Sequence, residues 1–115
     1  MPGRARRPVI GVLGNRFLIN DQYATTAVGQ MNLLAVAKAA EGLPLGLPAL
    51  PEAVEIGALL EACDGFVLTG GRANVHPSHY GEAETEAHAP FDPDRDGVAL
   101  PLIRAAVEAG APVLG

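Results

Sequence analysis

Short apolar runs of strand length alternate along this chain with segments of helical period. The runs that predict buried strands cover residues 9–13, 43–47, 65–69 and 111–114. The segments between them predict three helices. The first follows a polar loop, the second begins at residue 51, and the third runs from near residue 92 to a stop at Gly110. Strands that alternate with helices are typical of a parallel sheet covered by helices on both faces. The pattern therefore predicts an α/β fold.

The first two predicted helices are defined by their apolar positions. In the first helix these positions recur at i, i+4, i+7 and i+8, namely at Ala27, Met31, Leu34 and Ala35. Thr25 or Thr26 is available as its N-cap, and Gly42 is placed as its stop. The second predicted helix, residues 51–61, carries its apolar side chains on one side, at Ile56, Leu59, Leu60 and Cys63.

Prolines constrain two of the predicted elements. Pro44 and Pro48 interrupt the second strand, which suits an edge of the sheet better than its centre. Pro101 falls inside the third helix, where it removes the hydrogen bond to the carbonyl of Gly97 and costs about 3 kcal/mol. We therefore expect a kink at Pro101, or a helix that starts only near Val98.

Composition and charge narrow the class of protein. Of the 115 residues, 49% are hydrophobic but only 4% are aromatic, so the core is built from Ala, Val, Leu and Ile. The net charge is −5, and the only basic cluster, Arg4, Arg6 and Arg7, lies in residues 1–7, which predict a flexible tail. Nucleic-acid binding is not expected. No window approaches eighteen apolar residues, and residues 8–14 are too short and glycine-rich for a secretory signal. We expect a cytoplasmic protein with no membrane partner.

The single cysteine, Cys63, excludes an internal disulfide and a multi-cysteine metal site. It precedes the third predicted strand, whereas the ligand edge of an open parallel sheet lies at the carboxyl ends of the strands. Cys63 is therefore interpreted as a small buried thiol rather than a nucleophile.

Two groups of residues resemble metal ligands only in part. The histidines His76, His79 and His88 have no supporting cysteine or second pair, and we interpret them as loop residues. Asp92, Asp94 and Asp96 imitate the first half of a calcium loop, but its twelfth position is Ile103 instead of a bidentate Glu. Asp92 as an N-cap, with Asp94 favourable to the helix dipole, explains the same residues. We expect no metal and no cofactor.

A paired-glycine turn, Gly70-Gly71, follows the third predicted strand directly. Glycine pairs let the backbone approach a ligand closely, and N–H groups at the carboxyl end of a strand can form an oxyanion hole. An ordinary tight turn explains the pair equally well at this point. The polar segment that follows, to about residue 91, is longer than most structureless loops, which favours a functional role.

The motifs around this turn resemble a known family. The chain is similar to the N-terminal half of class I glutamine amidotransferase-like proteins, and more closely to their γ-glutamyl-γ-aminobutyrate hydrolase branch, peptidase C26. The matching segments are residues 7–12, 42–45, 63–71, 74–77, 80–82, 95–96 and 112–115. The most specific of these is the Thr-Gly-Gly turn followed by Asn-Val-His-Pro and Tyr-Gly-Glu.

The resemblance implies a fold and a chemistry. The fold is a three-layer, flavodoxin-like parallel sheet, of which residues 1–115 form the N-terminal part of a single domain, truncated after the strand that leads to the nucleophile. The chemistry is hydrolysis of a γ-glutamyl amide, as in polyamine (putrescine) catabolism, by a cysteine nucleophile through a thioester. In such proteins the cysteine follows the strand that here ends at Leu114, and a His and a Glu lie further on. None of these three residues lies within the 115 residues, so the chain is expected to be inactive alone.

The resemblance also implies roles for residues of this chain. Gly71 and Gly70 are the candidate oxyanion donors, and the candidates for substrate binding are Arg72, Asn74, His76 and Tyr80. The expected partner is a small γ-glutamyl substrate, and a homo-oligomer is allowed. Two alternatives stay open: a non-catalytic amidotransferase-like binding domain, and an ammonia-donating glutaminase subunit. The acidic residues Glu82, Glu84 and Glu86 form either a solvated loop edge or a patch that selects a cationic substrate.

Overall fold

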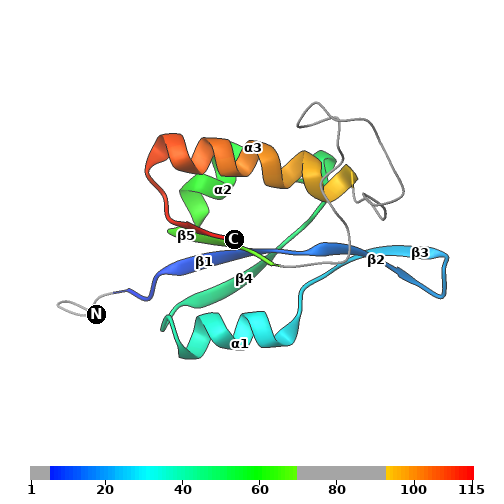
Figure 1. Cartoon of the computed structure of the whole chain (residues 1–115), viewed down its shortest axis with the longest axis horizontal. Helices are drawn as coiled ribbons and strands as arrows, with labels where there is room; N and C mark the ends of the chain where they lie inside the picture. Colours follow the sequence, from blue (N-terminus) through cyan, green and yellow to red (C-terminus); the bar gives the residue numbers. More distant parts are fainter. Residues whose placement is uncertain (1–5, 70–92) are drawn as a thin grey trace.

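A four-stranded parallel sheet forms the centre of the computed structural model, which describes residues 6–69 and 93–115. The strands lie in the order β4 (Leu43–Leu47), β1 (Val9–Leu13), β5 (Gly65–Leu68) and β6 (Val113–Leu114). One face carries α1 (Gln30–Lys38), and the other carries α2 (Ile56–Ala62) and α3 (Pro93–Ala109), as Figure 1 shows. The predicted α/β fold with helices on both faces is confirmed. The proline-containing strand β4 lies at an edge of the described sheet, as expected.

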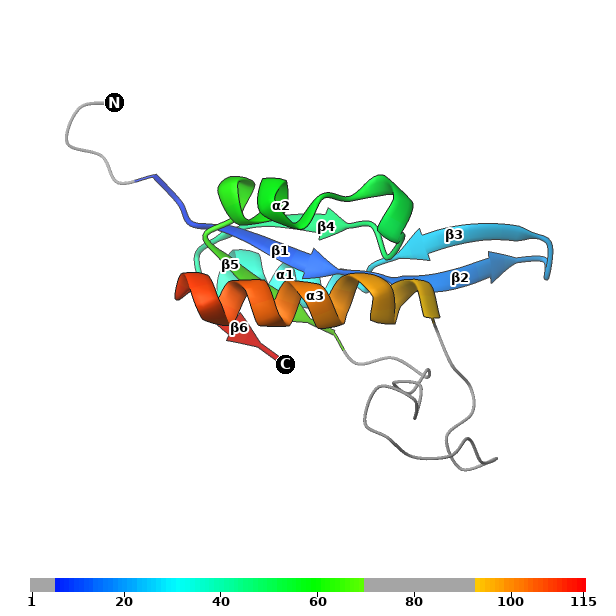
Figure 2. The ribbon, with the colours of Figure 1, turned by 90° about the horizontal axis from the view of Figure 1, so that it is seen from above.

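A β-hairpin replaces the predicted polar loop after the first strand. Its antiparallel strands are β2 (Asn15–Ile19) and β3 (Tyr23–Ala27), and it extends beyond the body of the sheet (Figure 2). Asn20 and Asp21 take φ angles of 53° and 56°, as at the centre of a type I′ turn. The signal was the Asn-Asp pair between two segments rich in aromatic and β-branched residues. The loop prediction was therefore wrong.

The hairpin also moves the start of the first helix. Thr25 and Thr26, the predicted N-caps, lie in β3, and α1 begins at Gln30 with Gly29 as its N-cap. The prediction failed because Ala27, the first position of the apolar spacing, is the last residue of β3 and pairs with Asn15. At the other end, α1 stops at Lys38, and the residue with a positive φ is Glu41 rather than the predicted stop, Gly42.

The second predicted helix divides into two pieces. Residues Pro51–Ala53 form a single 3₁₀ turn, η1, and the α-helix α2 begins only at Ile56. Val54 and Glu55 between them are extended. The predicted apolar side is confirmed, since Ile56, Leu59 and Leu60 pack against the core.

Helix α3 begins at Pro93 and continues through Pro101 to Ala109 (Figure 1). A start near Val98 was therefore wrong. Pro101 and Gly97, whose carbonyl the proline leaves without its helical partner, are both exposed residues. Gly110 ends the helix with a φ of 75°, and the N–H of Ala111 donates to the carbonyl of Ala106 at 2.9 Å. This arrangement is a Schellman motif, which requires the left-handed conformation that glycine adopts at no steric cost.

The main core lies between the sheet and the pair of helices α2 and α3. Its buried residues are Leu13, Leu47, Ala49, Cys63, Phe66, Val98, Leu102 and Ala106. The three core residues of α3 recur every four positions, which places them on one face of the helix. Val12 is also fully buried but lies outside this cluster, since successive strand residues point to opposite faces of a sheet. Burial of each large aliphatic side chain contributes roughly 2 kcal/mol.

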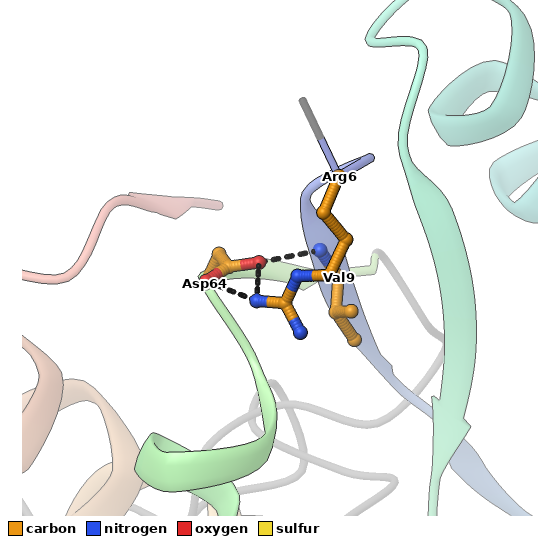
Figure 3. Close-up of polar contacts among 3 residues, drawn as sticks. All are labelled: Arg6, Val9 and Asp64. Atoms are coloured by element: carbon orange, nitrogen blue, oxygen red, sulfur yellow. Dashed lines mark hydrogen bonds and ion pairs between the residues drawn. The ribbon is translucent and has the colours of Figure 1, made fainter. Parts of the chain in front are cut away.

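Asp64, the residue before β5, joins β5 to β1 at the amino ends of these strands (Figure 3). Its carboxylate accepts a hydrogen bond from the N–H of Val9 at 2.7 Å, and its own N–H donates to the Val9 carbonyl at 2.7 Å. Arg6 forms an ion pair with the same carboxylate at 3.4 Å, with the arginine side chain 75% exposed. Asp64 thus extends the pairing of β1 with β5 by one residue.

The predicted burial of Cys63 is confirmed, because the residue is 5% exposed and lies in the core cluster. Burial, together with the neighbouring Asp64 carboxylate, raises the pKa of the Cys63 thiol. Among the helices that the structure describes, none is both long and apolar enough to cross a bilayer.

Replacement of Asp64 by Ala is expected to lower the free energy of unfolding by about 1–2 kcal/mol, because the N–H of Val9 loses a charged acceptor. Asp64→Asn keeps an acceptor oxygen and should cost less. Arg6→Ala is the matched control, with an effect within about 0.5 kcal/mol because exposed ion pairs are weak. Urea unfolding of the three variants measures these differences. Equal losses in Asp64→Ala and Arg6→Ala would contradict the assignment.

The raised pKa of Cys63 predicts a loss of stability at alkaline pH. The unfolded thiol ionises at its ordinary pKa and the folded thiol only above it, so the free energy of unfolding falls as the pH rises through the ordinary thiol range. The Cys63→Ala variant should lack this part of the slope. Denaturation curves between neutral and alkaline pH test it, and alkylation at pH 8 should be much slower in the folded chain than in urea. Identical slopes in the two proteins would refute the prediction.

Candidate functional site

The candidate site lies at the carboxyl ends of the central strands. In the parallel registers, Leu13 of β1 pairs with Leu47 of β4 on one side and with Leu68 of β5 on the other. The three strands therefore end level with one another, and the residues that follow them meet at one edge. Ligands of open α/β sheets bind at this edge, outside the carboxyl ends of the strands.

Gly14 brings the hairpin close to this edge. Its N–H donates to the carbonyl of Leu47 at 3.1 Å, which continues the pairing of β1 with β4. A Cβ atom at this position would lie 2.5 Å from the Cγ2 of Thr26 and 2.9 Å from the carbonyl oxygen of Ala27. Only glycine therefore lets β3 pass so close to the end of β1. The hairpin is held further by the Thr26 hydroxyl, which accepts from the N–H of Ala49 at 3.4 Å.

Thr69 follows β5 and is 5% exposed. Its hydroxyl donates to the carbonyl of Leu13 at 3.0 Å and accepts a hydrogen bond from the Nδ2 of Asn15 at 3.3 Å. The donor of the hydroxyl and one of its acceptor positions are thus both used. The side chain joins the end of β5 to the end of β1 and to the first residue of β2.

The first turn of α3 reaches the same point. The Nη2 of Arg95 donates to the backbone carbonyl of Thr69, so Thr69 is bonded through its side chain and its main chain. Asp94 and Asp96 lie in the same turn, where negative charge is favourable to the helix dipole, and Asp96 is 3% exposed. The expected dipole role of Asp94 agrees with this position. The start of α3 is therefore tied to the end of β5.

The two polar atoms of the Asn15 amide differ in their hydrogen bonds to the described residues. Its Nδ2 donates to Thr69, whereas its Oδ1 is buried and has no hydrogen-bond partner in the part of the chain that the structure describes. Because the Thr69 hydroxyl donates to Leu13, it must accept from Asn15, which assigns the amide orientation. Asn15 thus presents a buried acceptor at the sheet edge.

The residues predicted for the site stand next to this network in the sequence. Thr69 is the last residue described before them, and the predicted residues that lie outside the described ranges are Gly70, Gly71, Arg72, Asn74, His76 and Tyr80. The loop histidines and Asp92 also lie outside. Cys63 precedes β5 and so lies toward its amino end, away from this edge, as expected.

Sequence reasoning missed the three polar residues that the fold brings together. Thr69 and Arg95 lay within the segments that carry the family resemblance, but no role was derived for them. Asn15 lay in the segment interpreted as a loop. Within residues 6–69 and 93–115, no three His, Cys, Asp or Glu side chains gather as a metal site requires.

Comparison with known proteins places the chain in a family. The family model described as Peptidase C26 matches residues 8–115. The chain is 40% identical over 107 residues to the gamma-glutamyl-gamma-aminobutyrate hydrolase of Escherichia coli O157:H7, and 39% identical to the hydrolase of that name, PuuD, from strain K12. Each alignment covers 92% of this chain and 41% of the relative. The chain therefore spans about two fifths of the length of these hydrolases.

A glutamine amidotransferase-like protein of Rickettsia prowazekii is 32% identical over 77 residues, which cover 67% of this chain and 27% of the relative. The family match extends from the first strand of the sheet to residue 115 and includes every residue of the network at the sheet edge. The chain belongs to the peptidase C26 family.

Proposed function

We propose that this protein hydrolyses a γ-glutamyl amide, with residues 1–115 supplying one wall of the active site. The observation that carries the proposal is 40% identity, over 92% of the chain, to a gamma-glutamyl-gamma-aminobutyrate hydrolase. The position of Thr69 supports it, because the chain leaves β5 at the ligand edge of the sheet immediately before the Gly70-Gly71 pair.

The proposed mechanism is nucleophilic catalysis by a cysteine thiolate. The thiolate attacks the γ-carbonyl carbon, and the C=O electron pair moves onto oxygen to form a tetrahedral oxyanion. The N–H groups of Gly71 and Gly70 stabilise that oxyanion. Its collapse expels the amine, which takes a proton from a histidine, and leaves a thioester. Water, deprotonated by the same histidine, then releases glutamate and the thiol. The cysteine, the histidine and its glutamate partner lie outside residues 1–115.

Residues after the glycine pair are proposed to bind the substrate. Arg72, Asn74, His76 and Tyr80 shape the pocket for the γ-glutamyl group or for the released amine. The proposed enzyme acts in the cytoplasm on a small substrate, and the net charge of −5 supports a partner other than nucleic acid. A homo-oligomer is part of the same proposal.

A second candidate function is that of an ammonia-donating glutaminase. The similarity to a glutamine amidotransferase-like protein supports it. The two functions differ in the preferred substrate. A hydrolase of the first kind prefers a γ-glutamyl amine, whereas a glutaminase subunit prefers glutamine and depends on a synthase partner.

The 115-residue chain by itself is expected to release no amine from a γ-glutamyl amide above a buffer blank. The reason is that an oxyanion wall without a nucleophile and base leaves little catalysis. The comparison is with a protein extended to the length of the relatives and assayed in parallel. Turnover by the short chain that survives Cys63→Ala would contradict the assignment of the nucleophile to another segment.

In the extended protein, Gly71→Val is expected to lower kcat by about a hundredfold or more, the usual loss for one oxyanion donor, with a smaller effect on KM. His76→Ala should act mainly on KM if the histidine only shapes the pocket. Steady-state kinetics with a γ-glutamyl amide measure both constants, and a melting curve checks folding. A folded Gly71→Val enzyme with the wild-type kcat would show that the oxyanion assignment is wrong and that the glycine pair is an ordinary turn.

A further inference from the structure

The end of β5 is held from three different elements. The Thr69 hydroxyl bonds to the Leu13 carbonyl at the end of β1 and to the Asn15 side chain at the start of β2, and the Thr69 carbonyl accepts from Arg95 in α3. These partners lie 56, 54 and 26 residues away along the chain. We propose that Asn15, Thr69 and Arg95 form a clamp that positions the backbone leaving β5 for catalysis. This inference rests on the proposed function.

The hydroxyl of Thr69 holds the position of the residue. It is buried, and it acts as donor and acceptor at once, so both partners depend on it. Loss of the hydroxyl would leave the Nδ2 of Asn15 without its acceptor and would remove the donor to the Leu13 carbonyl. Buried polar groups that lose a partner tend to rearrange until they find another, because an unsatisfied group is costly. Residue 69, which lies one position beyond the last backbone pair of β5 with β1, would then lose its side-chain bonds to β1 and β2.

Arg95 holds the orientation of the backbone at the same residue. A peptide unit is planar, so a hydrogen bond that fixes the direction of the Thr69 carbonyl also fixes the plane in which the chain continues. Bonds donated by a guanidinium are charge-assisted and stronger than neutral ones. The side-chain bonds and the carbonyl bond thus restrain different degrees of freedom of one residue, its position and its rotation.

Such restraint matters for catalysis because oxyanion stabilisation depends on geometry. Donors must lie about 2.7–3.1 Å from the developing oxyanion, and productive sites hold their groups to within about 0.5 Å. A looser exit from β5 should weaken the transition state more than substrate binding. Loss of the clamp is therefore expected to lower kcat with little change in KM, and the three residues are positioning residues rather than catalytic ones.

The test uses Thr69→Val and Thr69→Ser in the protein extended to the length of the relatives. Valine keeps the shape of threonine without the hydroxyl, and serine keeps the hydroxyl. We expect Thr69→Val to lower kcat at least tenfold with KM changed less than about threefold, and Thr69→Ser to stay within about threefold of wild type in both constants.

Thr25→Val is the matched control. The Thr25 hydroxyl also donates to a backbone carbonyl, that of Phe17 at 2.6 Å, but it lies within the hairpin and takes no part in the clamp. Its kcat should equal that of wild type. Arg95→Gln supplies a second variant in case Thr69→Val does not fold, and it should also lower kcat at least tenfold. The double variant should lose less than the product of the two single losses, because both act on one backbone segment.

Melting curves establish folding, and the kinetic results below decide the proposal. The kcat losses with serine rescue support the clamp. A folded Thr69→Val or Arg95→Gln enzyme with the wild-type kcat overturns it, and so does a Thr69→Ser enzyme as impaired as Thr69→Val. An extended wild-type protein without activity on γ-glutamyl amides overturns the proposed function and the catalytic role of the clamp together. An active wild type with unaffected variants overturns the clamp alone.

Discussion

The pairing of β1 with β4 on one side and β5 on the other is the constraint on which the rest of the structure depends. Val12 and Leu13 of β1 are fully buried, on opposite faces of the sheet. The register ends all three strands at the same level. The core between the sheet and α2–α3 and the polar network at the strand ends therefore both depend on one alignment. A shift of register would move both at once.

The two ends of β5 are closed by different chemistry. At its amino end, Asp64 is half-exposed, and its carboxylate accepts a hydrogen bond from the N–H of Val9 in the way that a strand carbonyl would. At its carboxyl end, Thr69 is buried and bonded by both its hydroxyl and its carbonyl. The exposed end contributes to stability, and water can replace part of its contacts. The buried end has no such substitute, which is why it restrains the geometry of the backbone more strongly.

The hairpin after β1 is the main departure from a plain alternation of strands and helices. Gly14 permits the close approach of β3, and the Thr26 hydroxyl joins β3 to Ala49 after β4. Asn15 is thereby placed beside Thr69 instead of in a free connection. The hairpin also exposes large apolar side chains, namely Phe17, Ile19 and Tyr23. The hairpin thus places Asn15 at the candidate site, which a direct connection from β1 to α1 would not do.

The sequence by itself determined the class of fold, the strands of the sheet and the family. Apolar runs such as residues 9–13 and 65–69 are local signals, and burial on both faces leaves them few alternatives. The edge position of β4 followed from its prolines, and the burial of Cys63 followed from its place before β5. The family resemblance rested on short motifs, and the comparisons confirmed the family.

Only the tertiary structure decided where helices begin and which polar groups meet. The spacing from Ala27 was compatible with a helix, but pairing with Asn15 in the hairpin places it in a strand, because ladder hydrogen bonds outweigh weak local propensity. Helix α3 continues through Pro101, and the packing of Val98, Leu102 and Ala106 into the core supports one continuous helix. Thr69, Asn15 and Arg95 are far apart along the chain, and no spacing rule connects them. Their juxtaposition exists only once β1 and β5 pair and α3 packs across them.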